Sequence, residues 1–317
     1  MHKVFIHGGS GTTGLRLKER LLARDDVSLV EIGEAERKDP EAVKTCMASA
    51  EFTFFCLPDE AALEATPLAA EAGCRVIDCS FAHRTDPAWT YGYPELSPAR
   101  RAAVAASERV AGPGCHAGGC ICLMYPLLKS GLVPEDYPFC FTSVTGYSGG
   151  GKKMIAEYED ADRPASFSAP RQYALGQTHK HMREAKAVCG LQTEPVFLPI
   201  VDDFYAGMHV TLPLQPRCIP GRPTLKNVLE VLQSHYADSK LIHVLPEPVN
   251  DGMLSASALA GRDDLCICVS GNDERVLLHA LFDNLGKGAS GAAIQCFNIM
   301  AGLPEETGLV IGKAEVQ

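Results

Sequence analysis

The glycine-rich turn near the start of the chain constrains the fold more than any other feature of the sequence. A β-type run over residues 4–7 breaks into Gly8-Gly9-Ser10-Gly11-Thr12-Thr13-Gly14, and a helical pattern follows. Such glycines let the backbone approach a pyrophosphate closely, and the helix N-terminus supplies amide donors. We therefore expect a dinucleotide site at Gly8, Gly11 and Gly14, with Ser10, Thr12 and Thr13 as hydroxyl donors. A tight turn without a ligand is the alternative, since the spacing is not the strict G-x-G-x-x-G.

Strand and helix patterns alternate over the first third of the chain. β-type runs at residues 27–32, 52–57 and 75–79, with a helical pattern at 61–72, predict a parallel α/β sheet. After about residue 116 the strand patterns predict a more antiparallel layer. They lie at residues 139–145, 196–201, 209–214, 242–245 and 265–270, before a final helical pattern at 290–300.

The length of 317 residues is large for one hydrophobic core, so two domains are expected. The sequence shows no flexible linker, which favours a second domain inserted into the first. We predict a Rossmann-like dinucleotide-binding domain over residues 1–115 and 284–317. An inserted α+β domain over residues 116–283 would carry substrate binding and oligomerisation.

Charge and hydropathy restrict the partners. The net charge of -10 argues against nucleic acid or an anionic membrane as the main partner. The first residues lack the apolar core of a signal peptide, and the longest apolar run, residues 121–128, is too short to span a bilayer. We therefore expect a cytoplasmic protein that acts on a small molecule.

Thirteen cysteines need an explanation. Without an export signal we expect them to be reduced. The chain has no Cys-x-x-Cys, and Cys120/Cys122 and Cys266/Cys268 lie in apolar stretches, where free cysteine is usually buried. We expect core packing for these pairs and no metal site.

The choice between NAD and NADP stays open on residue chemistry alone. The second strand pattern is followed by Gly33-Glu34-Ala35-Glu36-Arg37-Lys38. An acidic residue there can hold the ribose hydroxyls of NAD, whereas Arg37 and Lys38 can bind a 2′-phosphate. A solvated charged loop explains the same residues.

A second signal is the run Gly112-Pro113-Gly114-Cys115, which precedes an apolar helical stretch. A cysteine in a Gly/Pro turn at a helix start feels the helix dipole, which lowers the thiol pKa and favours the nucleophilic thiolate. Inert packing is the alternative for a single cysteine.

The third signal is His179-Lys180-His181. A neutral imidazole beside a thiol can accept its proton and later return one. Residues two apart on a helix point to roughly opposite sides, so we expect only one of the two histidines to face a site. A surface pair is the alternative, and His209 is a rival base that we expect to be packed in a strand.

Together these signals resemble N-acetyl-γ-glutamyl-phosphate reductase, in the shorter of its two family types. The similarity covers nearly the whole chain, through motifs in a fixed order. They include Gly11-Thr12-Thr13-Gly14-Leu15, Cys56-Leu57-Pro58-Asp59, Ala82-His83-Arg84-Thr85, Pro113-Gly114-Cys115, Gly146-Tyr147-Ser148-Gly149-Gly150, His179-Lys180-His181 and Asp283-Asn284-Leu285-Gly286-Lys287.

The resemblance implies a semialdehyde-dehydrogenase-like fold and the third step of arginine biosynthesis. In that step NADPH reduces N-acetyl-γ-glutamyl phosphate to N-acetylglutamate semialdehyde, with release of phosphate. Cys115 would form a thioester, and His179 or, preferably, His181 would be the base. The resemblance adds to the NADP contacts of the glycine turn; the further residues are Arg37, Lys38, Leu57, Pro58, Ser80, Asn284 and Lys287. A homodimer or homotetramer is expected from fold analogy.

Substrate contacts are expected from Arg84, because guanidinium binds phosphate and carboxylate through paired hydrogen bonds, and from the turn at Ser148 and Gly149. A surface arginine and a plain tight turn are the alternatives.

The loop around Cys115 departs from the family pattern. The usual Asn-Pro-Gly-Cys-Tyr-Pro-Thr is replaced by Gly112 at its start and by His116-Ala117-Gly118 after the cysteine. This departure puts the substrate, not the reaction class, in question. One alternative is a related semialdehyde dehydrogenase that uses aspartyl phosphate or a carrier-bound acyl phosphate. The other is a catalytically silent dinucleotide-binding regulator, against which the retention of Cys115 and the histidine pair argues.

Overall fold

The computed structural model describes residues 1–313, and their backbone forms two compact units. The first unit consists of residues 1–114 and 289–309, and the second begins at Cys115 and runs to Gly288, with residues 310–313 added to it. The predicted division into a dinucleotide-binding domain, residues 1–115 and 284–317, and an inserted substrate-binding and oligomerisation domain, residues 116–283, stays a prediction.

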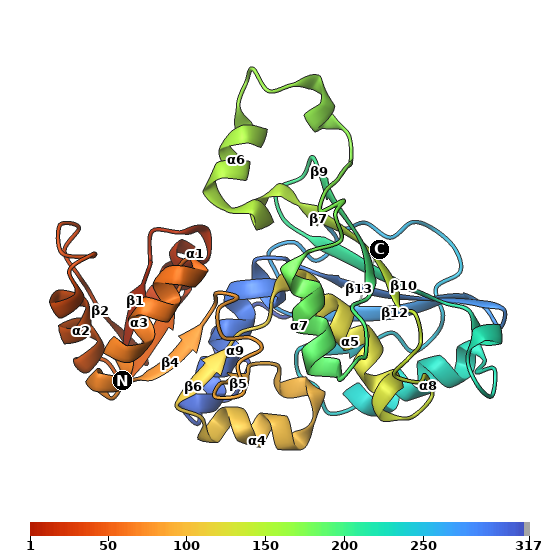
Figure 1. Cartoon of the computed structure of the whole chain (residues 1–317), viewed down its shortest axis with the longest axis horizontal. Coiled ribbons are helices and arrows are strands. Elements are labelled where there is room, and N and C mark those ends of the chain that lie inside the picture. The colour runs from red at the N-terminus through yellow and green to blue at the C-terminus, as the bar shows by residue number, and fades with distance from the viewer. Residues whose placement is uncertain (314–317) are drawn as a thin grey trace. The chain divides into compact units, whose positions relative to one another are not determined.

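The first unit contains a six-stranded parallel sheet with the order β2-β1-β3-β4-β6-β5 (Figure 1). Its strands are β1 (His2–His7), β2 (Val27–Val30), β3 (Phe52–Phe55), β4 (Arg75–Asp78), β5 (Thr90–Tyr91) and β6 (Arg109–Ala111). Its α-helices are α1 (Thr12–Leu22), α2 (Pro40–Ala48), α3 (Asp59–Ala72), α4 (Pro98–Ala106) and α9 (Gly291–Met300). Strands alternate with helices from β1 to β4, and all four residues of β3 are buried, as the near-continuous apolar run of a covered parallel strand requires.

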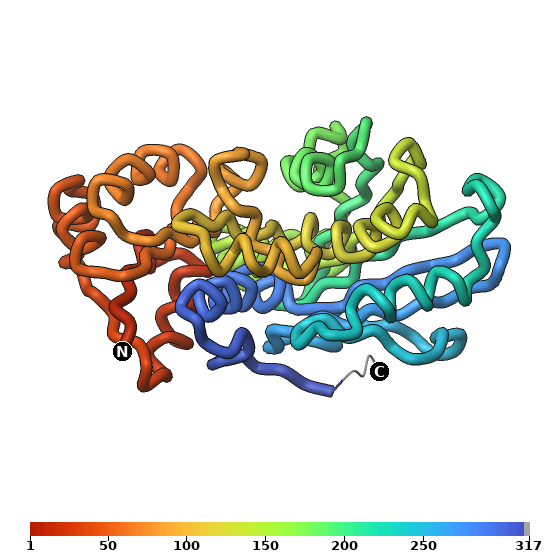
Figure 2. Tube along the Cα trace, turned by 90° about the horizontal axis from the view of Figure 1, so that it is seen from below, coloured from red at the N-terminus to blue at the C-terminus, as the bar shows by residue number. Residues whose placement is uncertain are grey.

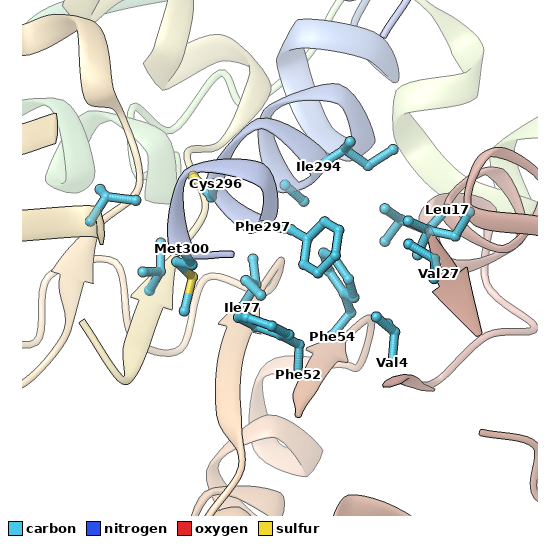
Figure 3. Close-up of a cluster of buried hydrophobic side chains, with 14 residues drawn as sticks. Val4, Leu17, Val27, Phe52, Phe54, Ile77, Ile294, Cys296, Phe297 and Met300 are labelled. Atoms are coloured by element: carbon cyan, nitrogen blue, oxygen red, sulfur yellow. The ribbon is translucent and has the colours of Figure 1, made fainter. Parts of the chain in front are cut away.

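The helix α9 returns to the first unit near the C-terminal end of the trace, drawn in blue in Figure 2. It completes an apolar core over one face of the parallel sheet, which Figure 3 shows in close-up. Phe297 of α9 meets Phe52 edge-to-face at a ring-centroid distance of 5.0 Å, and Ile77 and Leu17 belong to the same cluster. A fully buried aromatic side chain of this kind contributes about 1.5–3 kcal/mol.

The second unit contains a seven-stranded mixed sheet with the order β11-β12-β13-β10-β7-β9-β8. Its strands are β7 (Cys140–Gly146), β8 (Arg171–Gln172), β9 (Val196–Asp202), β10 (Met208–Leu214), β11 (Ile242–Val244), β12 (Leu265–Asn272) and β13 (Arg275–Phe282). Four neighbouring pairs are antiparallel, while β7/β9 and β11/β12 are parallel. The predicted α/β fold class is confirmed.

The α-helices of the second unit are α5 (Cys115–Lys129), α6 (Gly151–Glu159), α7 (Lys180–Cys189) and α8 (Leu225–Tyr236). The helix α5 packs against β10 and β13, and this contact needs Gly119. A Cβ atom at Gly119 would lie 2.6 Å from a methyl carbon of Val210, so a larger residue would push the helix off the sheet. The N-terminus of α5 is thereby held at a fixed place beside the sheet.

The paired cysteines are core residues, as expected. Cys120, Cys122, Cys266 and Cys268 are fully buried and reduced. Burial raises the pKa of Cys266 and Cys268 to about 12, which keeps both thiols protonated and unreactive. Within residues 1–313, no helix combines the length and the apolar character that a bilayer crossing needs.

Candidate active site

Within the glycine turn, residues 8–14, the segment from Gly8 to Gly11 lines a cavity of about 760 Å³ at the carboxyl end of β1 in the first unit. Seven of the expected cofactor residues belong to its wall. They are Gly8, Ser10, Gly11, Arg37, Lys38, Leu57 and Pro58. Such a position, beyond the carboxyl ends of parallel strands, is where α/β sheets bind ligands.

Two glycines of the turn have no room for a side chain. Gly8 has φ +89°, and a Cβ atom there would overlap the carbonyl oxygen of Cys56 at the end of β3. A Cβ atom at Gly14 would lie 2.6 Å from the carbonyl oxygen of Gly8. The turn is therefore folded tightly against the first turn of α1.

The N-terminus of α1 keeps donors for a bound phosphate. Its cap residue, Gly11, has no side chain with which to satisfy the first amides of the helix. The Oγ1 atom of Thr12 is buried and has no hydrogen-bond partner within the described part of the chain. A pyrophosphate at this place would accept from these groups, so the residues present fit a dinucleotide. Thr13 lies in the same first turn of α1.

Charges of both signs line the same cavity. Arg37 and Glu34 form an ion pair of 2.7 Å, and Lys38 and Glu31 also belong to the wall. Their arrangement is compatible with ribose hydroxyls or with a 2′-phosphate.

Beyond β4, a buried network holds the expected cofactor residue Ser80 and the expected substrate residue Arg84. The hydroxyl of Ser80 donates to the fully buried Asp78 at 2.8 Å, and His83 bonds to the same carboxylate at 2.6 Å. Arg84 donates to the carbonyl oxygens of Cys79 at 2.9 Å and Gly112 at 2.8 Å. Through these hydrogen bonds Arg84 links the loops that follow β4 and β6. Its expected contact with substrate stays a prediction.

In the second unit, Cys115 is the first residue of α5 and is half-buried. A thiol at this place lies in the positive field of the helix N-terminus, which favours the thiolate. A Cβ atom at Gly288 would lie 2.9 Å from the Cβ atom of Cys115, so the absence of a side chain at Gly288 gives the cysteine its room.

The structure brings a histidine from α7 to this thiol. A ligand atom of Cys115, one of His116 and one of His181 all lie within 4.8 Å of one another. His181 is the second residue of α7 and is 8% exposed. Its role as the base for Cys115 stays a prediction.

The expectation that His179 and His181 point to opposite sides is wrong. Their rings are 4.8 Å apart, and both lie close to the ring of His116, at 5.6 and 5.5 Å. The reason is that His179 is not helical. It is the N-cap of α7, and its Nδ1 atom accepts from the backbone N–H of His181 at 3.3 Å.

His116 lies at the centre of this group, with only 3% of its surface exposed. Its Nδ1 atom is 2.7 Å from the hydroxyl of Ser143 on β7, and its Nε2 atom is 2.7 Å from the hydroxyl of Tyr173. Burial, followed by the charge of His179, lowers the pKa of His116 to about 3, so the ring is neutral at physiological pH. Burial and then Cys115 raise the pKa of Tyr173, which keeps its hydroxyl protonated.

We call Cys115, His116, Tyr173, His179 and His181 the thiol cluster. Sequence reasoning noticed His116 only as an unusual neighbour of Cys115, and it missed Tyr173 and Ser143. Tyr173 follows the short strand β8, in a segment without a recognisable motif.

Three further expected residues of the second unit, Asn284, Ser148 and Gly149, contact one another. The side-chain amide of Asn284 donates to the hydroxyl of Ser148 at 2.9 Å and accepts from the backbone N–H of Gly207 at 2.8 Å. A Cβ atom at Gly149 would lie 3.2 Å from the same amide nitrogen. Lys287 is buried in a π-helical turn at Gly286–Ser290. Their expected roles toward cofactor and substrate stay predictions.

His209, the rival base, is packed as expected. It bonds to His279 at 3.0 Å and to Thr211 at 3.2 Å on the mixed sheet. Burial lowers the pKa of His209 to about 4. The hydrogen bonds of His209 therefore connect strands of the mixed sheet, and neither of these two bonds reaches the thiol of Cys115.

Comparison with known families first defines the class of protein. Residues 115–284 match the semialdehyde dehydrogenase dimerisation domain, and residues 37–104 match the semialdehyde dehydrogenase NAD-binding domain. The chain is therefore a pyridine-nucleotide-binding protein of the semialdehyde dehydrogenase class. Among solved structures, aspartate semialdehyde dehydrogenase II from Vibrio cholerae superimposes with a TM-score of 0.72 over 95% of this chain and 98% of that one. At 16% identity this likeness shows the fold alone.

Full-length relatives then define the particular family. The chain is 42% identical over 305 residues to N-acetyl-gamma-glutamyl-phosphate reductase 2 of Pseudomonas putida, covering 94% of this chain and 96% of the relative. It is 39% identical over 318 residues to the reductase 2 of Nostoc sp., covering 97% and 99%. The chain belongs to the N-acetyl-γ-glutamyl-phosphate reductase family, which confirms the resemblance seen in the sequence.

Proposed function

We propose that this protein reduces N-acetyl-γ-glutamyl phosphate to N-acetylglutamate 5-semialdehyde with NADPH, as a step of arginine biosynthesis. The observation that carries the proposal is the placement of His181 within 4.8 Å of the thiol of Cys115 at the N-terminus of α5. The family of the chain supports the substrate, because its relatives carry the name of this reaction.

The chemistry follows from the thiol. His181 accepts the thiol proton, and the sulfur of Cys115 attacks the acyl carbon, whose bond to the phosphate oxygen breaks. Phosphate leaves and a thioester remains on Cys115. A bound nicotinamide supplies the hydride. As the resulting thiohemiacetal collapses, the bond to sulfur breaks, the aldehyde is released and His181 returns the proton.

The cofactor proposal is NADP, held through the glycine turn. Arg37 and Lys38 line the same cavity as the turn, and the 2′-phosphate of NADP would compete with Glu34 for Arg37. We also propose a cytoplasmic homo-oligomer, a dimer or tetramer, because residues 115–284 match a dimerisation domain.

The test is the reverse reaction: phosphate-dependent reduction of NADP by N-acetylglutamate semialdehyde. We expect activity in the wild type and a loss of at least about 10⁴-fold in Cys115→Ala. Cys140→Ala, which removes another half-buried thiol, is the matched control and should stay active.

Two further arms replace the substrate by aspartate semialdehyde and NADP by NAD. A preference for aspartate semialdehyde would overturn the substrate, and a preference for NAD would overturn the cofactor. Cofactor binding without activity on either aldehyde would favour a silent regulator, and activity that survives Cys115→Ala would refute the thioester.

A further inference from the structure

Three groups of the thiol cluster form an arrangement that goes beyond what the reductase reaction requires, because the proposed mechanism uses Cys115 and His181 but gives His116 no role. Cys115 offers a thiolate, and His116 and His181 each offer a ring nitrogen, all within 4.8 Å of one another. Zinc bonds to sulfur at about 2.3 Å and to histidine nitrogen at about 2.0–2.1 Å, which places tetrahedral ligand atoms roughly 3.4–3.6 Å apart. Binding the ion therefore requires the three side chains to move closer together.

We propose that Cys115, His116 and His181 form an inhibitory Zn²⁺ site that holds the nucleophile in an unreactive state. On binding, the thiol of Cys115 releases its proton to solvent and a sulfur–zinc bond forms, with no change of oxidation state. The inhibitory consequence rests on the proposed function, because it requires that Cys115 is the nucleophile.

The ligand types select the ion. One thiolate and two imidazoles suit Zn²⁺ and not Mg²⁺ or Ca²⁺, which prefer oxygen ligands. Three protein ligands leave the fourth tetrahedral position to water, as in zinc sites that exchange their outer ligand. The ion uses the sulfur lone pair with which Cys115 would attack the acyl carbon, so zinc and acyl phosphate exclude each other.

The surroundings of His116 favour a ligand role. A metal-binding imidazole is usually oriented by an oxygen partner at its other nitrogen. His116 has such a partner on both sides, the Ser143 hydroxyl at Nδ1 and the Tyr173 hydroxyl at Nε2, each at 2.7 Å. The ion takes one nitrogen by displacing its hydroxyl partner, and the other nitrogen keeps a hydroxyl that fixes the ring.

The origin of the ligands explains why spacing did not reveal them. Closely spaced cysteines are the usual sequence signal of a zinc site, and in this chain those pairs are buried in the core. Here Cys115 and His116 are adjacent at the start of α5, and His181 comes from the start of α7, which packs against α5.

The experiment is a Co²⁺ titration of the chelator-treated, full-length protein, followed by Zn²⁺ displacement. We expect a thiolate-to-cobalt charge-transfer band and the visible bands of a four-coordinate ion, at one equivalent, bleached by one equivalent of Zn²⁺. Cys115→Ser should lose the charge-transfer band. His116→Gln, which can keep both hydroxyl partners but is a poor ligand, should weaken binding by roughly 100-fold or more, since even an orienting partner is worth 10–100-fold.

The matched control is His209→Gln, which removes a half-buried imidazole outside the thiol cluster and should bind Co²⁺ as the wild type does. If His116→Gln does not fold, His181→Gln tests the same ligand set from the other helix. A charge-transfer band that persists in Cys115→Ser would place the ion at another cysteine and overturn the proposal. Equal affinity in His116→Gln and wild type would overturn it as well.

The spectral titration is independent of catalysis, so a failure of the reductase assay does not affect it. In the active enzyme, Zn²⁺ inhibition should be relieved by increasing N-acetylglutamate semialdehyde and phosphate, and should weaken with His116→Gln in parallel with Co²⁺ affinity. Tight Co²⁺ binding at Cys115 without any inhibition would overturn both the role of Cys115 as the nucleophile and the inhibitory consequence, while the metal site itself would stand.

Discussion

The glycine turn of the first unit and the thiol cluster of the second depend on different chemical groups, backbone amides in the turn and side chains in the cluster. The turn is one continuous segment whose useful groups are backbone amides, and its glycines leave no room for a Cβ atom at Gly8 or Gly14. The thiol cluster gathers side chains from α5, α7 and the segment after β8. We therefore expect the turn to be damaged by adding atoms and the thiol cluster by removing them.

The sharpest test of this contrast compares the two histidines of α7. His181→Gln removes the proposed base, and we expect kcat to fall by about 10²–10⁴-fold. His179→Gln removes the N-cap, and we expect a loss of about 1 kcal/mol in the free energy of unfolding with a smaller loss of kcat. Steady-state kinetics with urea denaturation measure both, and the reverse order would make His179 the base.

Gly288, beside the thiol, is expected to be an exception to this contrast, because an atom added there should also lower activity. Gly288→Ala places a methyl group 2.9 Å from the Cβ atom of Cys115. Since a displacement of about 1 Å can cost 10²-fold, we expect kcat and the rate of iodoacetamide alkylation at Cys115 to fall by up to about 10²-fold. Gly176→Ala is the control, since no atom lies within 4 Å of its added Cβ. Unchanged alkylation in Gly288→Ala would refute the proposed crowding.

In the glycine turn, Gly8→Ala should raise the dissociation constant for NADP by at least about tenfold and leave alkylation of Cys115 unchanged. The methyl group would overlap the Cys56 carbonyl oxygen, and the residue has φ +89°. Gly73→Ala shares the left-handed backbone, at φ +71°, but has open space around it. It should lose stability by about 1–2 kcal/mol and bind NADP normally. Equal NADP affinity in both variants would show that NADP binding tolerates a side chain at Gly8.

The smallest effect concerns acid stability of the thiol cluster. The pKa of His116 falls from 6.5 to about 3 on folding. Between these values the unfolded chain binds the proton and the folded chain does not, so the free energy of unfolding decreases as the pH is lowered. We expect His116 to account for about 1 kcal/mol of the free energy of unfolding that is lost between pH 6.5 and 5.5, and His116→Gln to lose correspondingly less over the same interval. The free energy of unfolding is measured by urea denaturation at pH 6.5 and 5.5. An equal decrease in wild type and His116→Gln would contradict this assignment.

The same contrast explains what the sequence could predict. The glycine turn was recognisable because its strand, turn and helix are consecutive, and Cys115 because its Gly/Pro turn precedes an apolar helix. His181 could be proposed from its neighbourhood, but the position of His179 could not, because a shift of the helix start to Lys180 turns it from a helical residue into a cap. Tyr173 and Ser143 join His116 through tertiary contacts across 57 and 27 positions of the chain, which no local pattern encodes.

The last helix of the first unit has a consequence for how the protein is made. Phe297 and Ile294 of α9 complete a core begun by Val4 and Phe52, yet the ribosome adds them only after the whole 115–288 segment. At about 5–20 residues per second, the parallel sheet waits roughly 10–35 s with one apolar face uncovered. During this interval the nascent chain exposes an apolar face that a chaperone can bind, and the nucleotide-binding unit completes its native core only after α9 has been synthesised.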